Sequence, residues 1–336
     1  MTRLSLVTGG GGFIGGHLVR ALHGRGERVR VLDIAGAPGL PPEIEVVKAS
    51  ILDRPAVDRA LEGVDTLFHL AADPNLWSAQ PGSFLETNLR GTQIVLEASR
   101  AAGTRRVVYT STESIMRGYR LNGAGPLNEE TARASLEEMP GPYCRSKFLA
   151  ERAAFEAAAG GLPLVIVNPT MPMGPGDRHL TPPSRMLLDF LNGKHPTFLD
   201  WECNIVDARD AAIGHILAAE RGEIGQRYIL GGHNIRLRDF LLRIEALTHL
   251  PMPKRPVPYA AALLCAFVAE MVAAITRRPP LAPLAGVRLA RNPLTFDNAK
   301  ARSTLGFAAR PLEETLLDAV RDFARRKLLR RSVALA

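Results

Sequence analysis

A tyrosine and a lysine placed four residues apart could carry out proton transfer in this chain. Tyr143 and Lys147 lie in a stretch with a helical pattern, and residues four apart on a helix share one face. An ammonium group close to a phenol stabilises the phenolate and lowers a pKa that starts at about 10. Such a tyrosine can remove a proton from an alcohol or return one to a carbonyl oxygen. Because this spacing also occurs by chance on helices, the pair needs support from elsewhere in the sequence.

A third polar residue is expected where the strand predicted at residues 106–111 ends. Thr112, just past that strand, can hydrogen-bond a substrate oxygen and stabilise the charge that develops on it. Ser111 is the competing assignment for this role. Glu113 could be a further acid or base, although a structural or solvated role is the interpretation that we favour.

A glycine-rich turn near the N-terminus supports the tyrosine and lysine pair. Residues 8–15 read Thr-Gly-Gly-Gly-Gly-Phe-Ile-Gly and lie between an apolar strand and an apolar helix. Gly9 permits the tight turn, Gly12 lets the backbone approach a pyrophosphate, and Gly15 lets helix and strand pack closely. The free N–H groups at the start of the helix then face the phosphates. This arrangement predicts dinucleotide binding.

An acidic residue after the second strand distinguishes NAD from NADP. Asp33 lies 18 residues after Gly15 and ends an apolar run. A carboxylate there can accept hydrogen bonds from both ribose hydroxyls of NAD and repels a 2′-phosphate. We therefore expect NAD as the cofactor and no metal. The positive nicotinamide ring of the oxidised cofactor would lower the pKa of Tyr143 further, while hydride leaves the substrate for that ring.

Short strands alternate with helical patterns through the first half of the chain. This alternation is typical of a parallel sheet that is covered by helices, and helical patterns occupy residues 14–24 and 84–102. We expect an α/β fold, a Rossmann-type doubly wound parallel sheet with a smaller, interleaved C-terminal substrate lobe. The expected strands are residues 4–8, 28–33, 45–48, 66–70, 106–111, 163–168 and 226–231.

The two lobes are expected to be interleaved in sequence. Prolines and glycines after residue 168 suit loops that wrap a pocket. The predicted domains are residues 1–170 as an NAD-binding Rossmann domain, to which residues 204–231 return, residues 171–203 and 232–325 as a substrate-binding lobe, and residues 326–336 as a basic tail.

The composition is that of an ordinary globular protein with a basic surplus. Of 336 residues, 46% are hydrophobic and 23% charged, and the net charge is +8. Such a surplus can favour nucleic acid, a membrane surface or anionic ligands. Because no pattern of basic and aromatic residues accompanies it, we do not expect nucleic-acid binding. Three scattered cysteines and the lack of a signal-peptide pattern favour a cytoplasmic setting.

Taken together, these motifs resemble those of the extended short-chain dehydrogenases/reductases, the NAD-dependent epimerase/dehydratase family, over nearly the whole chain. The resemblance also includes residues 69–72 (His-Leu-Ala-Ala) and residues 87–92 (Thr-Asn-Leu-Arg-Gly-Thr). Within that superfamily the chain is most similar to the dihydroflavonol-reductase-like branch, and there to the bacterial hopanoid-associated sugar epimerase family. The stretches that carry this finer similarity are residues 72–77, 167–175 and 227–232.

The resemblance implies roles for several residues around the cofactor. Residues 70–72 would line the pyrophosphate and ribose, Asn88 would support the site, and residues 169–170 would meet the nicotinamide carboxamide. Family members usually have an acidic residue after the third strand for the adenine amine, a role that Ser50, before Ile51, would have to fill here. The expected cofactor contacts are Gly9, Gly12, Phe13, Ile14, Gly15, Asp33, Ser50, Ile51, Leu70, Ala71, Ala72, Asn88, Tyr143, Lys147, Pro169 and Thr170.

Departures from the family pattern bear on the substrate. Where nucleotide-sugar members often have an asparagine and an arginine, this chain has Met171 and Cys203, which cannot grip a nucleotide diphosphate in the same way. Glu113 takes the place of the aspartate in the Thr-Asp-Glu stretch of sugar dehydratases. Trp77 could stack on a substrate or simply cover apolar surface.

The leading hypothesis is therefore an NAD-dependent oxidoreductase of the short-chain dehydrogenase type. It would transfer hydride at a hydroxyl or carbonyl carbon of a small-molecule or lipid substrate, lipid-like or sugar-containing, with Tyr143 as acid and base. A sugar epimerase that retains its cofactor is the enzymatic alternative. A non-catalytic NAD(H)-binding scaffold or sensor is the alternative of another class, and the presence of Thr112, Tyr143 and Lys147 argues against it.

Two expectations concern partners. Extended members of the superfamily commonly pair through two helices, here residues 84–102 and 143–159, which predicts a homodimer. Residues 257–275 form an apolar stretch that contains Glu270 and precedes two arginines. We favour a helix that packs inside the substrate lobe. The alternative is a peripheral membrane contact, made together with the basic tail, whose cations would meet anionic headgroups.

Overall fold

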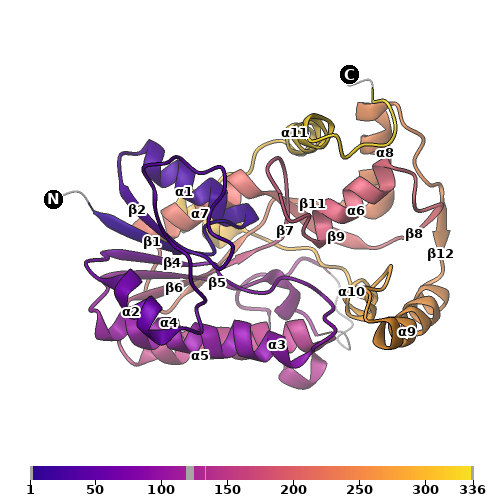
Figure 1. The fold of residues 1–336 in the computed structure, drawn as a ribbon. Helices are drawn as coiled ribbons and strands as arrows, with labels where there is room; N and C mark the ends of the chain where they lie inside the picture. Colours follow the sequence, from indigo (N-terminus) through magenta and orange to yellow (C-terminus); the bar gives the residue numbers. More distant parts are fainter. Residues whose placement is uncertain (1–2, 119–124, 133, 334–336) are drawn as a thin grey trace.

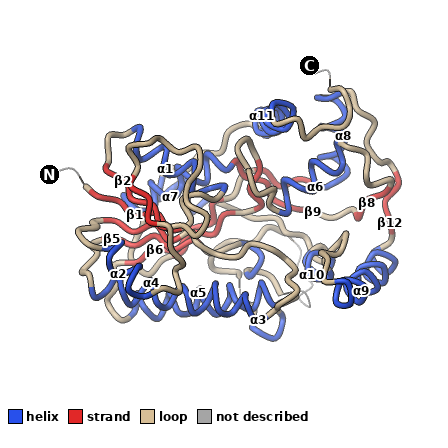
Figure 2. The backbone as a smooth tube through the Cα atoms, viewed as in Figure 1, coloured by secondary structure: helices blue, strands red, loops and turns tan. Residues whose placement is uncertain are grey.

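The fold consists of a large lobe built on a sheet and a smaller lobe built mainly of helices and loops (Figure 1). A computed structural model describes residues 3–118, 125–132 and 134–333. Figure 2 shows the strands of the larger lobe gathered between two layers of helices.

A seven-stranded parallel sheet forms the core of the larger lobe. Its order is β10-β6-β5-β4-β1-β2-β3, so the chain proceeds in opposite directions from β1, through β2 on one side and β4 on the other. Ligands of such sheets bind outside the carboxyl ends of the strands, at this switch point. The predicted fold class is confirmed. The strands are β1 (Leu4–Thr8), β2 (Arg28–Leu32), β3 (Glu45–Val47), β4 (Thr66–His69), β5 (Arg106–Thr110), β6 (Leu164–Pro169) and β10 (Arg227–Leu230).

Helices bury both faces of this sheet (Figure 1). In β1, Leu6 packs in an apolar cluster on one face and the next residue, Val7, packs in a separate cluster on the other. Such a strand reads as an unbroken apolar run because neither face meets water. The covering helices are α1 (Phe13–Gly24) and α7 (Ala208–Arg221) on one face, and α2 (Arg54–Leu61), α4 (Gly91–Ala101) and α5 (Pro142–Ala159) on the other.

The helix expected at residues 84–102 contains a wider turn than an α-helix. It begins as α3 (Gly82–Phe84), continues as the π-helical segment η1 (Leu85–Arg90) and ends as α4. Asn88 lies in the π-helical segment, and its buried side chain bonds to groups outside the helix. Single π-turns of this kind often occur at functional sites.

The smaller lobe contains two short sheets. A three-stranded sheet has the order β11-β9-β7, and a two-stranded sheet pairs β12 with β8. Its strands are β7 (Met171–Met173), β8 (Thr197–Leu199), β9 (Glu202–Asp207), β11 (His233–Arg236) and β12 (Arg255–Val257). Its helices are α6 (Pro182–Leu191), α8 (Leu237–Thr248), α9 (Tyr259–Thr276), α10 (Leu284–Leu289) and α11 (Leu312–Arg325). Short helical turns are η2 (Glu113–Ile115), η3 (Leu136–Glu138) and η4 (Ala301–Leu305).

Within residues 204–231, which are predicted to return to the Rossmann domain, α7 and β10 join the large sheet and its helices, whereas β9 joins another sheet. This strand pairs with β7 and β11, whereas β10 pairs with β6. The reason is that successive side chains of β9 face opposite sides of the strand. Cys203 and Ile205 face the core of the smaller lobe, while Val206 packs with the larger lobe, so β9 joins the two cores.

The basic C-terminal segment is folded onto the protein. Leu328, Leu329 and Val333 pack against the core of the smaller lobe, and the Arg326 guanidinium donates to the carbonyl of Asp177 across 2.7 Å. Residues 326–333 of the predicted basic tail are therefore packed on the smaller lobe, and residues 334–336 lie outside the described part of the chain.

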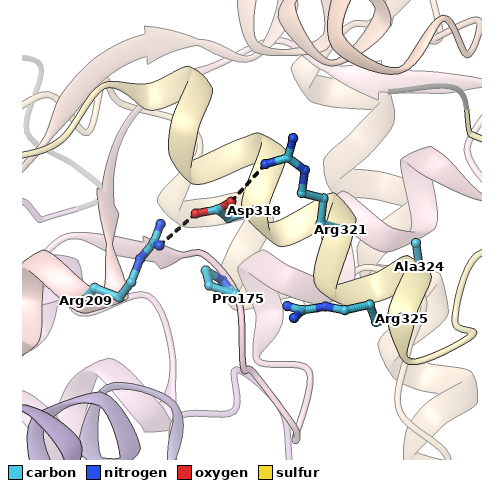
Figure 3. Close-up of a pocket in the computed structure, with 6 residues that line it drawn as sticks. All are labelled: Pro175, Arg209, Asp318, Arg321, Ala324 and Arg325. Carbon is cyan, nitrogen blue, oxygen red and sulfur yellow. Dashed lines mark hydrogen bonds and ion pairs between the residues drawn. The ribbon is translucent and has the colours of Figure 1, made fainter. Parts of the chain in front are cut away.

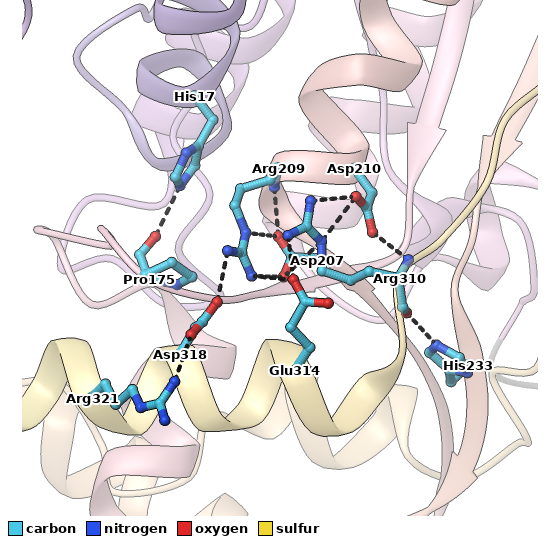
Figure 4. A network of polar contacts seen from close by, with 10 residues as sticks. All are labelled: His17, Pro175, Asp207, Arg209, Asp210, His233, Arg310, Glu314, Asp318 and Arg321. Carbon is cyan, nitrogen blue, oxygen red and sulfur yellow. Dashed lines mark hydrogen bonds and ion pairs between the residues drawn. The ribbon is translucent and has the colours of Figure 1, made fainter.

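A polar network ties α11 to the larger lobe (Figure 4). Arg209, at the start of α7, donates to both carboxylate oxygens of Asp207 across 2.9 and 2.8 Å and to Asp318 on α11 across 2.7 Å. Arg310 makes a matching pair with Asp210. Bidentate pairs of this kind hold geometry well, so the network orients the two lobes around the region between them.

Candidate active site

The glycine turn after β1 is packed too closely for side chains, as Gly9 and Gly15 illustrate. Gly9 has a φ of 71°, and a Cβ on it would lie 2.8 Å from the nitrogen of Ala71. A Cβ on Gly15 would lie 2.2 Å from the Gly9 carbonyl oxygen. Gly12 caps α1 without a side-chain hydrogen bond, and the first helical turn, with Phe13 and Ile14, holds no acidic residue. The N-terminus of α1 is thus a cradle that fits an anionic pyrophosphate.

Asp33 lies directly beside this cradle. Its carboxylate accepts hydrogen bonds from the backbone N–H of Gly11 across 3.0 Å and of Ala35 across 2.9 Å. The side chain is half-buried, so its carboxylate stays accessible at the end of β2. The position is the one that the sequence predicts for the residue that meets the ribose.

A buried histidine, to which the sequence assigned no role of its own, links the turn to its neighbours. The Nδ1 atom of His69 lies 2.7 Å from the Thr8 hydroxyl, and Nε2 lies 3.0 Å from the Thr92 hydroxyl. Burial, with a smaller effect of Lys147, lowers the pKa of His69 to about 3, so the ring is neutral. The Thr8 hydroxyl also accepts from the N–H of Ala71. A polar residue at the end of an apolar strand is the signal that could have revealed it.

Asn88 connects the loop after β4 to the helix that carries Tyr143. Its amide oxygen accepts from the N–H of Asp73 across 2.8 Å, and its amide nitrogen donates to the hydroxyl of Ser146 across 2.9 Å. Since Ser146 lies on α5 between Tyr143 and Lys147, Asn88 joins this helix to the loop after β4.

The remaining expected cofactor contacts also follow strands of the large sheet. The Ser50 hydroxyl accepts from the N–H of Leu52 across 3.1 Å, and Ile51 is buried against Gly91. Leu70 and Ala72 flank Ala71 after β4, where the carboxyl ends of the parallel strands meet. Pro169 ends β6, and the buried hydroxyl of Thr170 donates to Asn204 across 2.7 Å. The Thr170 side chain is thus bonded within the protein.

Tyr143 occupies the first turn of α5 and is 9% exposed. Burial raises the pKa of its phenol above the usual value, the negative charge of Glu113 adds to this, and a hydrogen bond with Thr112 opposes it. We expect Lys147 to lower the pKa of Tyr143. For the protein chain without cofactor this expectation is wrong, because the pKa of Tyr143 is raised. The Tyr143 phenol bonds with Thr112 instead, and the charge of Glu113 acts on it through space.

Lys147 reaches strand β5 instead of Tyr143. Its ammonium donates to the hydroxyl of Tyr109 across 3.2 Å and to the carbonyl of Thr110 across 2.8 Å. Burial lowers the pKa of Lys147 to about 8, and the nearby carboxylate of Glu151 acts in the opposite direction. Glu151 follows Lys147 by four residues, a helical spacing from which the sequence could have indicated the contact.

The end of β5 places Thr112 and Glu113 together. The Thr112 hydroxyl donates to the Glu113 carboxylate across 2.9 Å, and the Thr112 carbonyl accepts from the amide of Asn168 across 3.1 Å. Burial raises the pKa of Glu113. A solvated role for Glu113 is therefore wrong. The Ser111 hydroxyl is buried and has no hydrogen-bond partner among the described residues, while Thr112 is the one that meets Tyr143.

Apolar side chains surround the Tyr143 end of the site. Tyr143 belongs to a cluster with members from several loops and helices, and half-buried Trp201 packs against both this cluster and the core of the smaller lobe. Sequence reasoning missed Trp201. Trp77, which it considered for stacking on a substrate, is half-buried in the loop after β4. The other buried members of the cluster are Phe84, Ile115, Met116, Leu127, Met139, Cys144, Ile229, Leu294 and Phe296.

An open hollow of about 510 Å³ lies away from this site, beside α11 (Figure 3). The side chains of Arg209 and Arg321 converge there on Asp318, with Arg325 alongside. None of the residues predicted to bind cofactor lines this hollow. It belongs to the network of ion pairs between the lobes.

Comparisons with known proteins agree with this geometry. The NAD dependent epimerase/dehydratase family matches residues 5–231. A protein of Synechocystis sp. with the provisional name dihydroflavonol 4-reductase is 36% identical over 94% of this chain and 93% of its own length. Sterol demethylase protein B of Methylococcus capsulatus is 31% identical over 97% of this chain and 99% of its own.

A solved structure extends the agreement to the cofactor. MoeE5 in complex with UDP-glucuronic acid and NAD is 26% identical, with a TM-score of 0.75, over 96% of this chain and 99% of that one. The protein is an NAD-dependent enzyme of the oxidoreductase and epimerase kind, as its motifs predict. The chain belongs to the NAD dependent epimerase/dehydratase family, a branch of the extended short-chain dehydrogenases/reductases.

Proposed function

We propose that the protein transfers hydride between NAD(H) and a hydroxyl or carbonyl carbon of a lipid-like substrate, with Tyr143 as the acid and base. The observation that carries this proposal is the position of Tyr143. Its phenol bonds with Thr112 and feels the charge of Glu113 at the carboxyl edge of the sheet, and its ring belongs to an apolar cluster. Polar chemistry beside an apolar wall suits an alcohol or ketone on a hydrocarbon skeleton.

The cofactor residues divide the binding of NAD among them. The α1 N-terminus would hold the pyrophosphate, Asp33 the adenosine ribose, and Ser50 with Ile51 the adenine. Residues 169–170 would meet the carboxamide. When bound, NAD supplies the acceptor or donor of hydride.

The chain's own residues handle the proton. Tyr143 takes the hydroxyl proton of an alcohol substrate as hydride leaves its carbon, and returns a proton in the reverse direction. Thr112, whose hydroxyl donates to Glu113, would turn this hydrogen bond to the same substrate oxygen. Lys147, on α5, is held against β5 by Tyr109 and Thr110, and its ammonium would donate a hydrogen bond to the cofactor ribose.

The substrate class follows from the apolar wall and from two missing donors. Cys203 is buried with its thiol toward the carbonyl of Ile235, and Met171 packs against the core of the smaller lobe. Neither side chain can pair with a diphosphate. The relative named sterol demethylase protein B also carries a lipid class in its name. A nucleotide-sugar substrate is therefore the less favoured alternative.

A direct test uses purified protein with NAD and a panel of hydrophobic secondary alcohols, sterols among them, with NADH absorbance as the readout. The proposal expects turnover of at least one such alcohol, and none in the Tyr143→Phe variant. Turnover only of nucleotide sugars, with cofactor that remains bound through denaturing extraction, would establish the epimerase alternative. Tight NAD(H) binding without turnover of either class would favour the scaffold or sensor.

Assembly and setting complete the proposal. We propose a cytoplasmic homodimer that pairs through the helix of α3, η1 and α4 together with α5, which lie side by side on one face of the large sheet (Figure 1). We also propose residues 1–170 as the NAD-binding domain, with the substrate-binding lobe formed by residues 171–203 and 232–325.

A further inference from the structure

Helix α9 (Tyr259–Thr276) exposes an unusual amount of apolar surface. It is the one helix among the described residues that is long and apolar enough to cross a membrane, with a mean hydropathy of 1.9, yet only 11% of it is buried. The prediction that this stretch packs inside the substrate lobe is therefore wrong. Figure 1 shows α9 at the outer edge of the smaller lobe.

The exposed apolar side chains share one face of α9. They recur at helical spacing, and each is more than half exposed. Soluble surfaces rarely carry a contiguous apolar ridge of this kind unless it binds something. These side chains, which we call the α9 ridge, are Leu264 (64%), Phe267 (53%), Val268 (53%), Met271 (55%), Val272 (53%) and Ile275 (83%).

The opposite face of α9 is anchored to the protein. Ala266 and Ala273 are buried there, and the carboxylate of Glu270, between them, accepts from the N–H of Leu284 at the start of α10 across 3.1 Å. The strand β12, which precedes α9, pairs with β8, and the helix α10, which follows α9, packs against it. The segments on both sides of α9 therefore belong to the folded lobe. The helix is about 27 Å long at 1.5 Å per residue, and it is held parallel to the surface of the lobe.

Positive charge accompanies the ridge at both ends. Arg255 precedes α9, and Arg277 and Arg278 follow it, all of them exposed. From residue 246 to residue 296 the only acidic residue is Glu270, which faces inward. An apolar helical face with cations at its ends and no exposed acid is complementary to a bilayer interface that contains anionic lipid.

The ridge is connected to the active site through a single helix. A Cβ on Gly141, which caps the catalytic helix two residues before Tyr143, would lie 2.9 Å from the Cβ of Ala285 in α10. Leu289, also in α10, packs against the apolar cluster that contains Tyr143. A bilayer that meets the ridge would therefore be separated from the Tyr143 cluster by α9 and α10.

From this geometry we propose that the α9 ridge docks the protein on the surface of an anionic lipid bilayer, in the plane of the interface. The proposal deepens the proposed function, on which its lipid substrate rests. The C-terminal basic residues take no part, because that segment and α11 lie on the far side of the smaller lobe from α9 (Figure 1).

Vesicle sedimentation of the full chain tests the docking. The protein should pellet with vesicles of phosphatidylcholine and phosphatidylglycerol at low salt, and less with phosphatidylcholine alone. The double variant Phe267→Ser with Met271→Ser should lose binding by about tenfold, because two side chains no longer leave water. Matched exposed residues elsewhere, Ile224→Ser with Leu242→Ser, should leave binding unchanged, since they lie outside the ridge.

A label gives a second readout. Among the described cysteines, Cys265 on α9 is exposed and the other two are buried, so an environment-sensitive fluorophore attaches there. Its emission should shift to the blue with anionic vesicles. An unchanged emission spectrum, or equal pelleting of both double variants, would overturn the proposal. A change from one oligomeric state to another in the ridge variant, without vesicle binding by the wild type, would assign the ridge to a second copy instead.

The outcomes for docking and for catalysis are separable. NAD binding and turnover of a water-soluble secondary alcohol, measured without vesicles, should be equal in the ridge variant and the wild type. If the Tyr143→Phe variant keeps its activity, the proposed function fails whatever the vesicles show. If wild-type protein in cell membranes resists alkaline carbonate and is released only by detergent, α9 spans the bilayer and the in-plane docking is wrong.

Discussion

The ammonium of Lys147 donates a hydrogen bond to the hydroxyl of Tyr109 and lies 4.9 Å from the centre of the Tyr109 ring. Both side chains are buried, one on α5 and the other on β5. Helix α5 is thereby attached to the sheet at Lys147, while the phenol of Tyr143, one turn earlier, bonds with Thr112 and feels the charge of Glu113. The two ends of the Tyr-x-x-x-Lys pair thus have separate environments and can be tested separately.

Tyr143→Phe should reduce turnover by at least about a hundredfold, because only the ionisable hydroxyl is lost. NAD affinity, measured by fluorescence titration, should stay within about twofold. Tyr228→Phe is the control, since that buried tyrosine lies on β10 and its hydroxyl meets the backbone N–H of Glu223. Substantial activity in the Tyr143→Phe protein would exclude Tyr143 as the acid and base.

Burial of Lys147 predicts a pH dependence of stability. Its pKa falls from 10.5 to about 8 on folding, so between these values the unfolded state binds more protons than the native state and stability rises with pH. Relative to Lys147→Met, the wild type should gain up to roughly 3 kcal/mol of unfolding free energy from pH 8 to pH 10.5. Urea unfolding at both pH values measures it. The exposed Lys254→Met is the control, and a flat difference for Lys147→Met would contradict the prediction.

Asp33 should determine the choice of cofactor. NAD(H) should bind at least about tenfold more tightly than NADP(H), a difference of roughly 1.4 kcal/mol, because the carboxylate repels a 2′-phosphate. Asp33→Ser should remove most of this preference, whereas Asp53→Asn, after β3 and capping α2, should leave it intact. Fluorescence titration of the wild type and of both variants with NAD(H) and NADP(H) measures this preference. Equal affinities in the wild type would remove Asp33 from the role.

Glu113 should act on Tyr143 through its charge. Since the charge of Glu113 raises the pKa of Tyr143, Glu113→Gln should move the pH profile of alcohol oxidation toward lower pH. The amide oxygen can still accept from Thr112, so turnover should remain within about tenfold. Complete loss of activity, with NAD binding retained, would show that Glu113 itself transfers a proton.

The homodimer should involve the exposed side of η1. Leu85 is 45% exposed there, next to α5. Light scattering at micromolar concentration should give a dimer for the wild type and for Ile224→Glu, and a monomer for Leu85→Glu, because a charge would be buried in the interface. A monomeric wild type would contradict the dimer.

The sequence alone carried enough information for the features whose causes are local. Gly9 and Gly15 are required because a side chain would collide with backbone within the same turn or directly beside it. The strands of the large sheet were recognisable because continuous apolar runs require burial on both faces. Tyr143 and Lys147 share a helix face for the same kind of local reason.

Only the tertiary structure decided which groups meet across long separations in the chain. Lys147 pairs with Tyr109, 38 residues earlier, and His69 joins Thr8 to Thr92. The raised pKa of Tyr143 also depends on the tertiary structure, because segments distant in the chain bury the phenol and oppose its ionisation. For α9 the sequence showed an apolar helix, but composition does not distinguish a buried helix from an exposed one. Its ridge faces outward because α10 covers only the alanine stripe around Glu270, which leaves the larger side chains no protein to pack against.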